Sequence, residues 1–207
     1  MTPETETTPR DAVLDAFRTA MSQLAAGVVI VTCHVGGKPW GLTVSACCSV
    51  SMSPPLLLVS LGASTTSTRA IQESGEFGVS LLGQSLIDVA RFGSAPGQPK
   101  FVESYCDGCP DISCSPVVAG ALAHVDCRLE RHVPAGDHVL LIGEVRNVVV
   151  TEDDNEGPLV YHRRSYHQLS ASTGLHVGAE PEEETIDSLL HDYPMPRRFA
   201  RVVSLGA

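Results

Sequence analysis

Short apolar runs, several of which alternate apolar and polar residues with a period of two, dominate the sequence and predict β-strands. The expected strands cover residues 28–34, 40–51, 56–61, 76–82, 117–131 and 139–150. Apolar residues recur at helical spacing from Thr8 to Gly27, and shorter helices are expected after residue 68 and over residues 84–92. Short strands with few helices predict a mainly β protein, an antiparallel barrel.

One stretch of this pattern departs from an ordinary core strand. Residues 41–51 place Thr43, Ser45, Ser49 and Ser51 along strand-like backbone, and a Pro pair at 54–55 precedes a continuously apolar run. A core strand rarely needs so many small hydroxyl residues. A groove for a flat ligand with polar edges does need small donors and close approach of the backbone. The stretch therefore indicates a ligand site.

Two further patterns carry polar chemistry. The hydroxyl run from Ser64 to Thr68, followed by Arg69, precedes a short helix. A single Ser or Thr would suffice as the helix cap, whereas the whole run with free N–H groups makes an anion cradle. In Gly136-Asp137-His138, the histidine at a turn–strand junction can donate to a carboxamide or an anionic group, and Asp137 can fix its tautomer. The plain alternative is a turn with a solvated histidine.

Composition excludes several classes of function. The chain has 207 residues, enough for one substantial domain with a tail, and a formal net charge of −10. This acidity argues against nucleic acid or an anionic membrane as the main partner. Neither an apolar leader nor a run of membrane-spanning length is present, so a cytoplasmic protein is expected.

The cysteines predict free thiols. Seven cysteines are an odd number, and without a secretion signal they do not indicate a disulfide framework. Cys106, Cys109 and Cys114 have a C-x2-C-x4-C spacing. A structural zinc site usually includes a second pair with similar spacing, and none follows, so reduced thiols without a metal are favoured.

The motifs together resemble the flavin reductase family, short-chain NAD(P)H-dependent enzymes that supply reduced flavin to partner monooxygenases. The resemblance rests on Gly41, Thr43, Ser45, Ser49-Val50-Ser51, Pro54-Pro55, Gly136-Asp137-His138, Pro158-Leu159-Val160-Tyr161 and Tyr166. Two departures stand out. Cys47 and Cys48 replace an aromatic and a small polar residue, and Ser53 stands where the family often has Asp.

The resemblance implies a homodimeric split β-barrel with FMN or FAD near the subunit interface and NADH or NADPH as hydride donor. It implies His138 at the nicotinamide as the catalytic contact, and a partner oxygenase that receives reduced flavin by diffusion. The residues expected at the cofactor are Thr32, Thr43, Val44, Ser45, Ala46, Ser49, Pro55, Ser64, Thr66, Ser67, Thr68, Asp137 and Tyr166. The expected division is a disordered stretch over 1–10, the barrel over 11–170, and an extension over 171–207 that is either a solvated tail or an arm covering the partner or the flavin.

Two other functions stay open. A split barrel can hold a flavin, pyridoxal or haem group for a different reaction, because fold does not fix chemistry, and the Cys47-Cys48 pair is a local reason to keep that alternative. A cofactor-free interaction module would leave the hydroxyl strand and the Gly136-Asp137-His138 motif unexplained. A dinucleotide would have to bind outside a Rossmann fold, since no G-x-G-x-x-G fingerprint opens a βαβ unit.

Overall fold

The computed structural model describes residues 9–106, 115–151 and 156–169. The chain divides into two units, Met1–Ala171 and Ser172–Ala207, and the second lies outside the described residues. The first contains α1 (Pro9–Ser22), β1 (Ala26–Gly27), β2 (Val29–Val35), β3 (Lys38–Val44), β4 (Cys47–Met52), β5 (Pro55–Gly62), α2 (Thr66–Ser74), β6 (Glu76–Leu81), η1 (Gln84–Leu86), α3 (Ile87–Ser94), η2 (Glu103–Tyr105), β7 (Ala123–Ala135), β8 (His138–Val150), β9 (Leu159–His162) and β10 (Ser165–Gln168).

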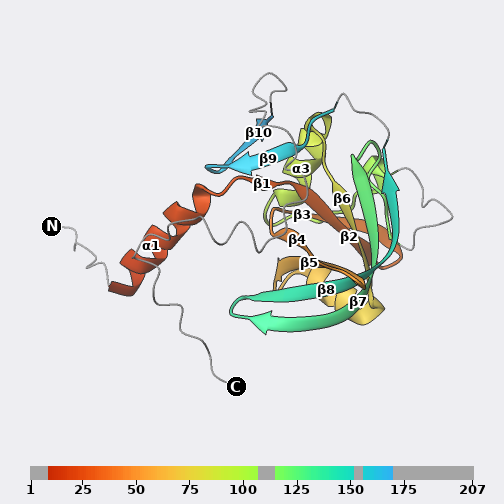
Figure 1. The fold of residues 1–207 in the computed structure, drawn as a ribbon, viewed down its shortest axis with the longest axis horizontal. Helices are drawn as coiled ribbons and strands as arrows, with labels where there is room; N and C mark the ends of the chain where they lie inside the picture. Colours follow the sequence, from red (N-terminus) through yellow and green to blue (C-terminus); the bar gives the residue numbers. More distant parts are fainter. Residues whose placement is uncertain (1–8, 107–114, 152–155, 170–207) are drawn as a thin grey trace, which may run out of the picture. The chain divides into compact units, whose positions relative to one another are not determined.

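Seven antiparallel strands form the main sheet in the order β3-β2-β6-β7-β8-β5-β4, and β1, β9 and β10 form a small second sheet (Figure 1). The predicted mainly β class is confirmed. The edge strands β3 and β4 are consecutive in the chain, and only Ser45 and Ala46 separate them. Three Cα steps reach about 11 Å at most, so the sheet curls until its two edges approach each other. The Ser60 N–H donates to the Ala46 carbonyl at 3.0 Å, and this hydrogen bond holds the Ser45–Ala46 link against β5.

The alternating side chains of β2 divide the core in two. Val29 and Val31 face the concave interior of the sheet with Phe77, Val79 and Leu141. Val28 and Ile30 face the opposite side, where Leu82, Val89, Ala90 and Leu159 form a second cluster under α3 and β9. Residues 29–33 of β2 are therefore buried on both faces, as the apolar run that begins this strand suggests.

A buried polar network joins β6 and β7 to the segment that begins at Ser115. His124 has its Nδ1 at 2.9 Å from the Ser80 hydroxyl and its Nε2 at 3.1 Å from the Ser115 hydroxyl, which itself donates to Asp126. Since the Ser115 hydrogen is given to Asp126, its oxygen accepts from His124 Nε2–H, and Nδ1 accepts from Ser80. Burial lowers the pKa of His124, an effect that the charge of Asp126 partly opposes. The network therefore favours a neutral imidazole.

Some predicted boundaries were wrong. The strand expected over residues 40–51 is two strands, β3 and β4, because the chain leaves the ladder at Ser45 and Ala46. Helix α1 ends at Ser22, short of the predicted Gly27, because β1 already pairs with β9 from Ala26 onward. Strand β7 begins at Ala123 instead of residue 117, because the chain turns at Gly120 with φ +72°, which interrupts an extended ladder. None of the helices in the described part of the chain combines the length and apolar character needed to cross a bilayer.

Candidate functional site

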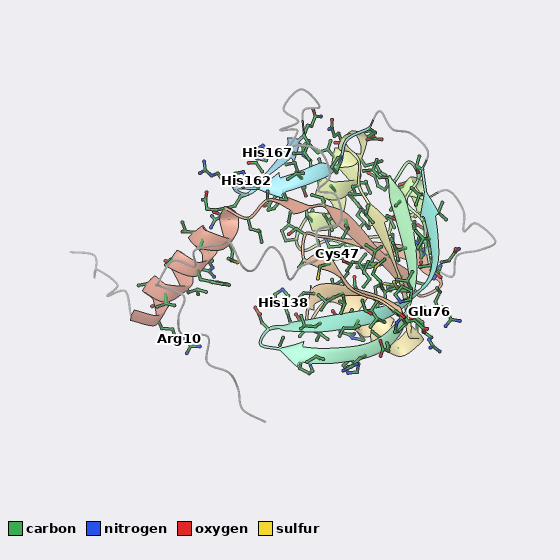
Figure 2. All side chains as sticks on the ribbon, in the orientation of Figure 1. Arg10, Cys47, Glu76, His138, His162 and His167 are labelled. Atoms are coloured by element: carbon green, nitrogen blue, oxygen red, sulfur yellow. The ribbon has the colours of Figure 1, made fainter. Side chains whose placement is uncertain are left out.

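Three segments singled out in the sequence meet at one end of the main sheet. Gly62 at the end of β5 pairs with His138 at the start of β8, and the Ala63 N–H donates to the Asp137 carbonyl at 2.9 Å. The Ser45–Ala46 link is bonded to the same end of β5 through Ser60. Figure 2 shows His138 and Cys47 on this side of the molecule. The fold therefore gathers the hydroxyl strand, the hydroxyl run and the Asp137-His138 motif, although Ser45 and His138 are 93 residues apart in the sequence.

A cavity of about 320 Å³ lies at the end of β3, and we call it the tyrosine cavity. Its lining consists of Val28, Thr43, Val44, Ser45, Ser94, Tyr161, Arg164 and Tyr166. The two tyrosine rings meet edge to face with centroids 5.3 Å apart, and the Tyr166 hydroxyl lies 3.3 Å from the Ala90 carbonyl. Aromatic walls with a few polar groups suit a flat heteroaromatic ring. Four of the predicted cofactor residues (Thr43, Val44, Ser45 and Tyr166) line this cavity.

The hydroxyl group of Thr43 can accept a hydrogen bond from a ligand but cannot donate one. Its hydroxyl donates to the Ala90 carbonyl at 2.9 Å and so has already used its one hydrogen. Buried Gly93 of α3 packs directly against Thr43, and a Cβ at that position would come within 3.1 Å of the Thr43 backbone nitrogen. The close approach of α3 therefore fixes the position of Thr43 in the cavity wall.

A second cavity, of about 430 Å³, lies between β3, α2 and the segment before residue 101, and we call it the hydroxyl cavity. Its lining consists of Trp40, Leu42, Ser64, Thr65, Thr66, Ser67, Gly97, Gln98, Pro99 and Lys100. Thr65 caps α2 by accepting from the Thr68 N–H at 3.2 Å. The cavity therefore combines hydroxyl groups, the start of a helix and one lysine, which together suit an anion.

The hydrogen bonds within the hydroxyl run show which groups are available to a ligand. Thr68 is 1% exposed and donates its hydroxyl hydrogen to the Gly62 carbonyl at 2.9 Å. Ser67 is also 1% exposed, and its oxygen accepts from the indole of Trp40 at 3.2 Å. These two residues hold α2 in place, whereas Ser64 and Thr66 are exposed at the cavity. Ser64 and Thr66 are therefore the hydroxyl residues of this run that are exposed to a ligand, whereas the hydroxyl hydrogen of Thr68 is already used.

Thr32, Ser49 and Pro55 lie outside both cavity linings. Thr32 is fully buried and donates to the Pro116 carbonyl at 2.7 Å, so its hydroxyl serves the core. Ser49 and Pro55 are exposed on the hairpin of β4 and β5.

Lys100 adds a positive charge that the sequence patterns did not assign to the site. Its ammonium group donates to the Ala95 carbonyl and lines the hydroxyl cavity. Partial burial lowers the pKa of Lys100, as expected for a cation removed from part of its water. An anion bound beside it would reverse that effect and favour the charged form. Tyr161, Ser94 and Arg164 also line the tyrosine cavity without having been predicted at the cofactor, although Tyr161 belongs to the Pro158-Leu159-Val160-Tyr161 motif.

Asp137 and His138 form an exposed pair at the turn between β7 and β8. His138 Nδ1 donates to the Asp137 carboxylate at 2.8 Å, and this hydrogen bond, with the charge of His138, lowers the pKa of Asp137. The side chain of His138 is 48% exposed. With Nδ1 held by Asp137, Nε2 of His138 remains available to a ligand.

The two neighbouring cysteines of β4 point to opposite faces of the strand. Cys47 is half-buried against the core, and burial together with Cys48 raises the pKa of Cys47 to about 11, whereas Cys48 is exposed. Cys109 and Cys114 of the predicted cysteine cluster lie outside the described residues. Among the residues that are described, no group of three His, Cys, Asp or Glu side chains is placed to hold a metal ion.

The residues present fit a flavin. The two cavities adjoin each other along β3. Leu42 lines the hydroxyl cavity, and the next residue, Thr43, lines the tyrosine cavity. One is aromatic with polar edges and suits an isoalloxazine ring, and the other is cationic and rich in hydroxyl groups and suits a phosphate.

Comparison with known proteins identifies the family. Residues 21–170 match the family described as flavin reductase like domain, and the chain belongs to it. The chain is 38% identical over 159 residues to the actinorhodin polyketide dimerase of Streptomyces coelicolor. The aligned region covers 76% of this chain and 88% of that protein. It is also 38% identical over 159 residues to the flavin reductase (NADH) of Kitasatospora aureofaciens, covering 73% and 80% respectively. The fold resembles BorF, the flavin reductase component of a bacterial two-component tryptophan halogenase, with TM-score 0.68, 28% identity and coverage of 75% and 98%.

Proposed function

We propose that this protein is an NADH- or NADPH-dependent flavin reductase that reduces FMN or FAD and supplies the reduced flavin to a partner oxygenase. Flavin supplies the chemistry of accepting a hydride. A bound flavin would accept the hydride released from the C4–H bond of a dihydronicotinamide, so the nicotinamide would be oxidised as the flavin is reduced by two electrons. Both NADH-dependent and two-component reductases occur among the relatives.

The protein contributes position more than acid–base chemistry. The tyrosine cavity takes the isoalloxazine ring, with Thr43 accepting from a donor on its edge or on the ribityl chain. The hydroxyl cavity takes the phosphate through Ser64, Thr66 and Lys100. His138, oriented by Asp137, contacts the nicotinamide through Nε2. These assignments rest on the cavity linings and on the hydrogen bonds that leave each group free to bind.

The single observation that carries the proposal is the meeting of these three segments at one end of the sheet in a member of this family. The test is anaerobic: protein is mixed with FMN, NADH is added, and the visible absorbance band of the flavin is followed. Bleaching that depends on the protein supports the reductase. Absence of bleaching with NADH and NADPH, and with FMN and FAD, would refute it.

A second function is favoured by one specific observation. The relative from Streptomyces coelicolor is named a polyketide dimerase and not a reductase. A flavin-binding protein of this family with another redox reaction would bind FMN or FAD in the same experiment without bleaching it. Binding without bleaching would therefore identify this alternative.

We also propose that the protein works as a homodimer. Val13, Leu14, Phe17 and Met21 recur at helical spacing on α1 and are all exposed. On the edge strand β4, Val50 is 49% and Met52 86% exposed. A second copy would cover this apolar surface and would bring Ser49 and Pro55 next to an interface. Light scattering after gel filtration measures the mass; a monomer at micromolar concentration would contradict this proposal.

A further inference from the structure

Three hydroxyl groups that line the tyrosine cavity have already used their hydrogen. Thr43 donates to the Ala90 carbonyl at 2.9 Å, and Ser94 donates to the Arg91 carbonyl at 3.0 Å. The Tyr166 hydroxyl also donates within the protein, to the Ala90 carbonyl at 3.3 Å. Each of these groups can therefore accept a hydrogen bond from a ligand but cannot donate one.

Arg164 is the charged donor of this lining. The other lining side chains are apolar, hydroxyl or phenol groups, so Arg164 supplies the charge of the cavity wall. Arg164 is exposed, and within residues 9–106, 115–151 and 156–169 its guanidinium has no hydrogen-bond or ion-pair partner. Because a guanidinium has several N–H donors and no acceptor, it can bind those acceptor atoms of a ligand that the used hydroxyl groups cannot bind.

The turn between β9 and β10 holds Arg164 in a strained conformation. His162 pairs with Ser165, so Arg163 and Arg164 form a two-residue hairpin turn beside His162, which Figure 2 labels. The φ angles of the two arginines are +48° and +63°, in the left-handed region where a side chain is strained and Asn-Gly is preferred. Arg163 donates to the Gln23 side-chain carbonyl at 2.9 Å, which attaches the turn to the chain just after α1. Strained backbone of this kind is often kept where it serves a function.

Reduction of a flavin changes the charge of its ring system. A hydride from a dihydronicotinamide brings two electrons and one proton; it bonds to N5, and the displaced electron pair moves to N1 and the C2 oxygen. The oxidised isoalloxazine is neutral, and without a second proton the reduced one carries one negative charge. A cation beside N1 therefore stabilises the reduced form more than the oxidised form. The formal net charge of −10 on the whole chain works in the opposite direction.

We propose that Arg164 binds the N1–C2=O edge of the isoalloxazine in the tyrosine cavity and stabilises its reduced, anionic form. This inference rests on the proposed reductase function and adds to it a residue that sets the reduction potential of the bound flavin. The affinity for reduced flavin in turn sets how long the product stays bound before it passes to the partner oxygenase.

The test measures the midpoint potential of bound FMN in the full-length protein. Xanthine oxidase with a mediator reduces the FMN and a reference dye together under anaerobic conditions, so that no nicotinamide is needed. A titration with oxidised FMN gives its Kd, and the difference in potential between bound and free FMN then gives the Kd for reduced FMN. The wild type is compared with Arg164→Gln and Arg164→Gly.

The two Arg164 variants should bind reduced FMN selectively more weakly. Loss of one charge-assisted contact predicts a Kd for reduced FMN that is roughly tenfold higher, with a change of less than about threefold for oxidised FMN. The ratio of the two constants then changes by roughly threefold to tenfold, which lowers the midpoint potential of this two-electron couple by about 15–30 mV.

The pH dependence of the potential gives a second signature. Where N1 of the bound reduced flavin gains a proton, the uptake rises from one proton to two per two electrons, and the slope of the potential against pH doubles. Without the guanidinium the anion is less stable, so this pH should be higher in both variants. The other titratable side chains around Arg164 are the same in every protein compared: Tyr161, Tyr166, His162, His167, Arg163 and Arg18.

Two controls remove a positive charge elsewhere. Arg131 lies on β7, pairs with Glu130 at 3.6 Å and lines neither cavity, so Arg131→Gln should leave both Kd values within about twofold. Lys100 lines the hydroxyl cavity, and the phosphate proposed to bind there keeps its charge when the ring is reduced. Lys100→Gln should therefore weaken the binding of both forms equally and leave the potential unchanged.

Arg164→Gly separates this role from folding. It removes the guanidinium and also relieves the positive φ, so its Tm should equal or exceed that of the wild type while the potential falls. An unchanged potential in both Arg164 variants would overturn the proposal. Equal losses of affinity for oxidised and reduced FMN would overturn it as well, because Arg164 would then bind the flavin without regard to its charge. Bleaching of the flavin by NADH, measured on the same preparation, shows separately whether the reductase function holds.

Discussion

Replacement of Gly93 by alanine tests whether the contact between α3 and β3 positions the site. A Cβ at residue 93 would lie 3.1 Å from the Thr43 backbone nitrogen and 3.3 Å from its Cβ, with the Thr43 hydroxyl nearer still. The backbone atoms cannot move away by a change of rotamer. The hydroxyl can rotate only by giving up its bond to the Ala90 carbonyl. Either α3 shifts away from β3 or Thr43 changes its orientation.

The expected cost follows from these contacts. Insertion of a methyl group into a packed contact costs about 1–3 kcal/mol, and loss of the Thr43 hydrogen bond would cost about 1 kcal/mol. Alanine recovers at most about 1 kcal/mol of helix propensity relative to glycine. We expect a net loss of about 1–3 kcal/mol in the free energy of unfolding, which lowers Tm by roughly 2–12 °C for a chain of this size.

Thermal unfolding measures the loss of stability, and a flavin titration measures the change in FMN affinity. Gly93→Ala should lower Tm. It should also raise the Kd for FMN by roughly three- to tenfold, since a loss of about 1 kcal/mol of binding free energy from a misplaced Thr43 corresponds to that range. Gly27→Ala is the matched control, because a Cβ there meets nothing within 4 Å. A Gly93→Ala variant with raised Tm and unchanged FMN affinity would refute the inference that this contact fixes Thr43 in the cavity.

Three further variants test individual groups. His138→Ala should raise the KM for the nicotinamide far more than the Kd for flavin, and an unchanged KM removes His138 from the nicotinamide site. Lys100→Gln should weaken FMN binding roughly tenfold and leave riboflavin binding, which involves no phosphate, unchanged; equal losses would place Lys100 elsewhere. Burial lowers the pKa of His124 from 6.5, so the unfolded chain binds a proton more readily than the folded one. Stability should therefore fall as the pH drops below about 6.5, and His124→Gln should flatten this part of the profile in denaturant titrations; an unchanged slope would exclude His124 as its source.

Sequence patterns predicted the local elements better than their contacts. The period-two runs were sufficient to predict most strands, because alternation reports burial directly. The hydroxyl run from Ser64 to Thr68 shows the limit of this approach. Five similar side chains in sequence differ in role once folded, since Thr68 turns toward the Gly62 carbonyl and Ser67 toward Trp40. Which hydroxyl retains a free hydrogen depends on partners that only the tertiary structure supplies.

The basic residues show the same limit in a different way. Neither Lys100 nor Arg164 belongs to a pattern of charges along the chain. Their significance arises because the fold places each at a cavity, Lys100 beside α2 and Arg164 between β9, β10 and α1. A turn formed by two arginines with positive φ cannot be distinguished in sequence from an ordinary polar loop.

The burial of Cys47 has a consequence for the lifetime of the protein. Reduced flavin that meets oxygen before its partner yields peroxide, and peroxide attacks thiolates rather than thiols. With a pKa of about 11, only about one Cys47 in ten thousand is ionised at neutral pH. Cys48 lies exposed on the opposite face of β4 and lacks this protection by burial. Oxidation of the two thiols of this strand should therefore begin at Cys48 and leave the Cys47 thiol, which faces the core, intact.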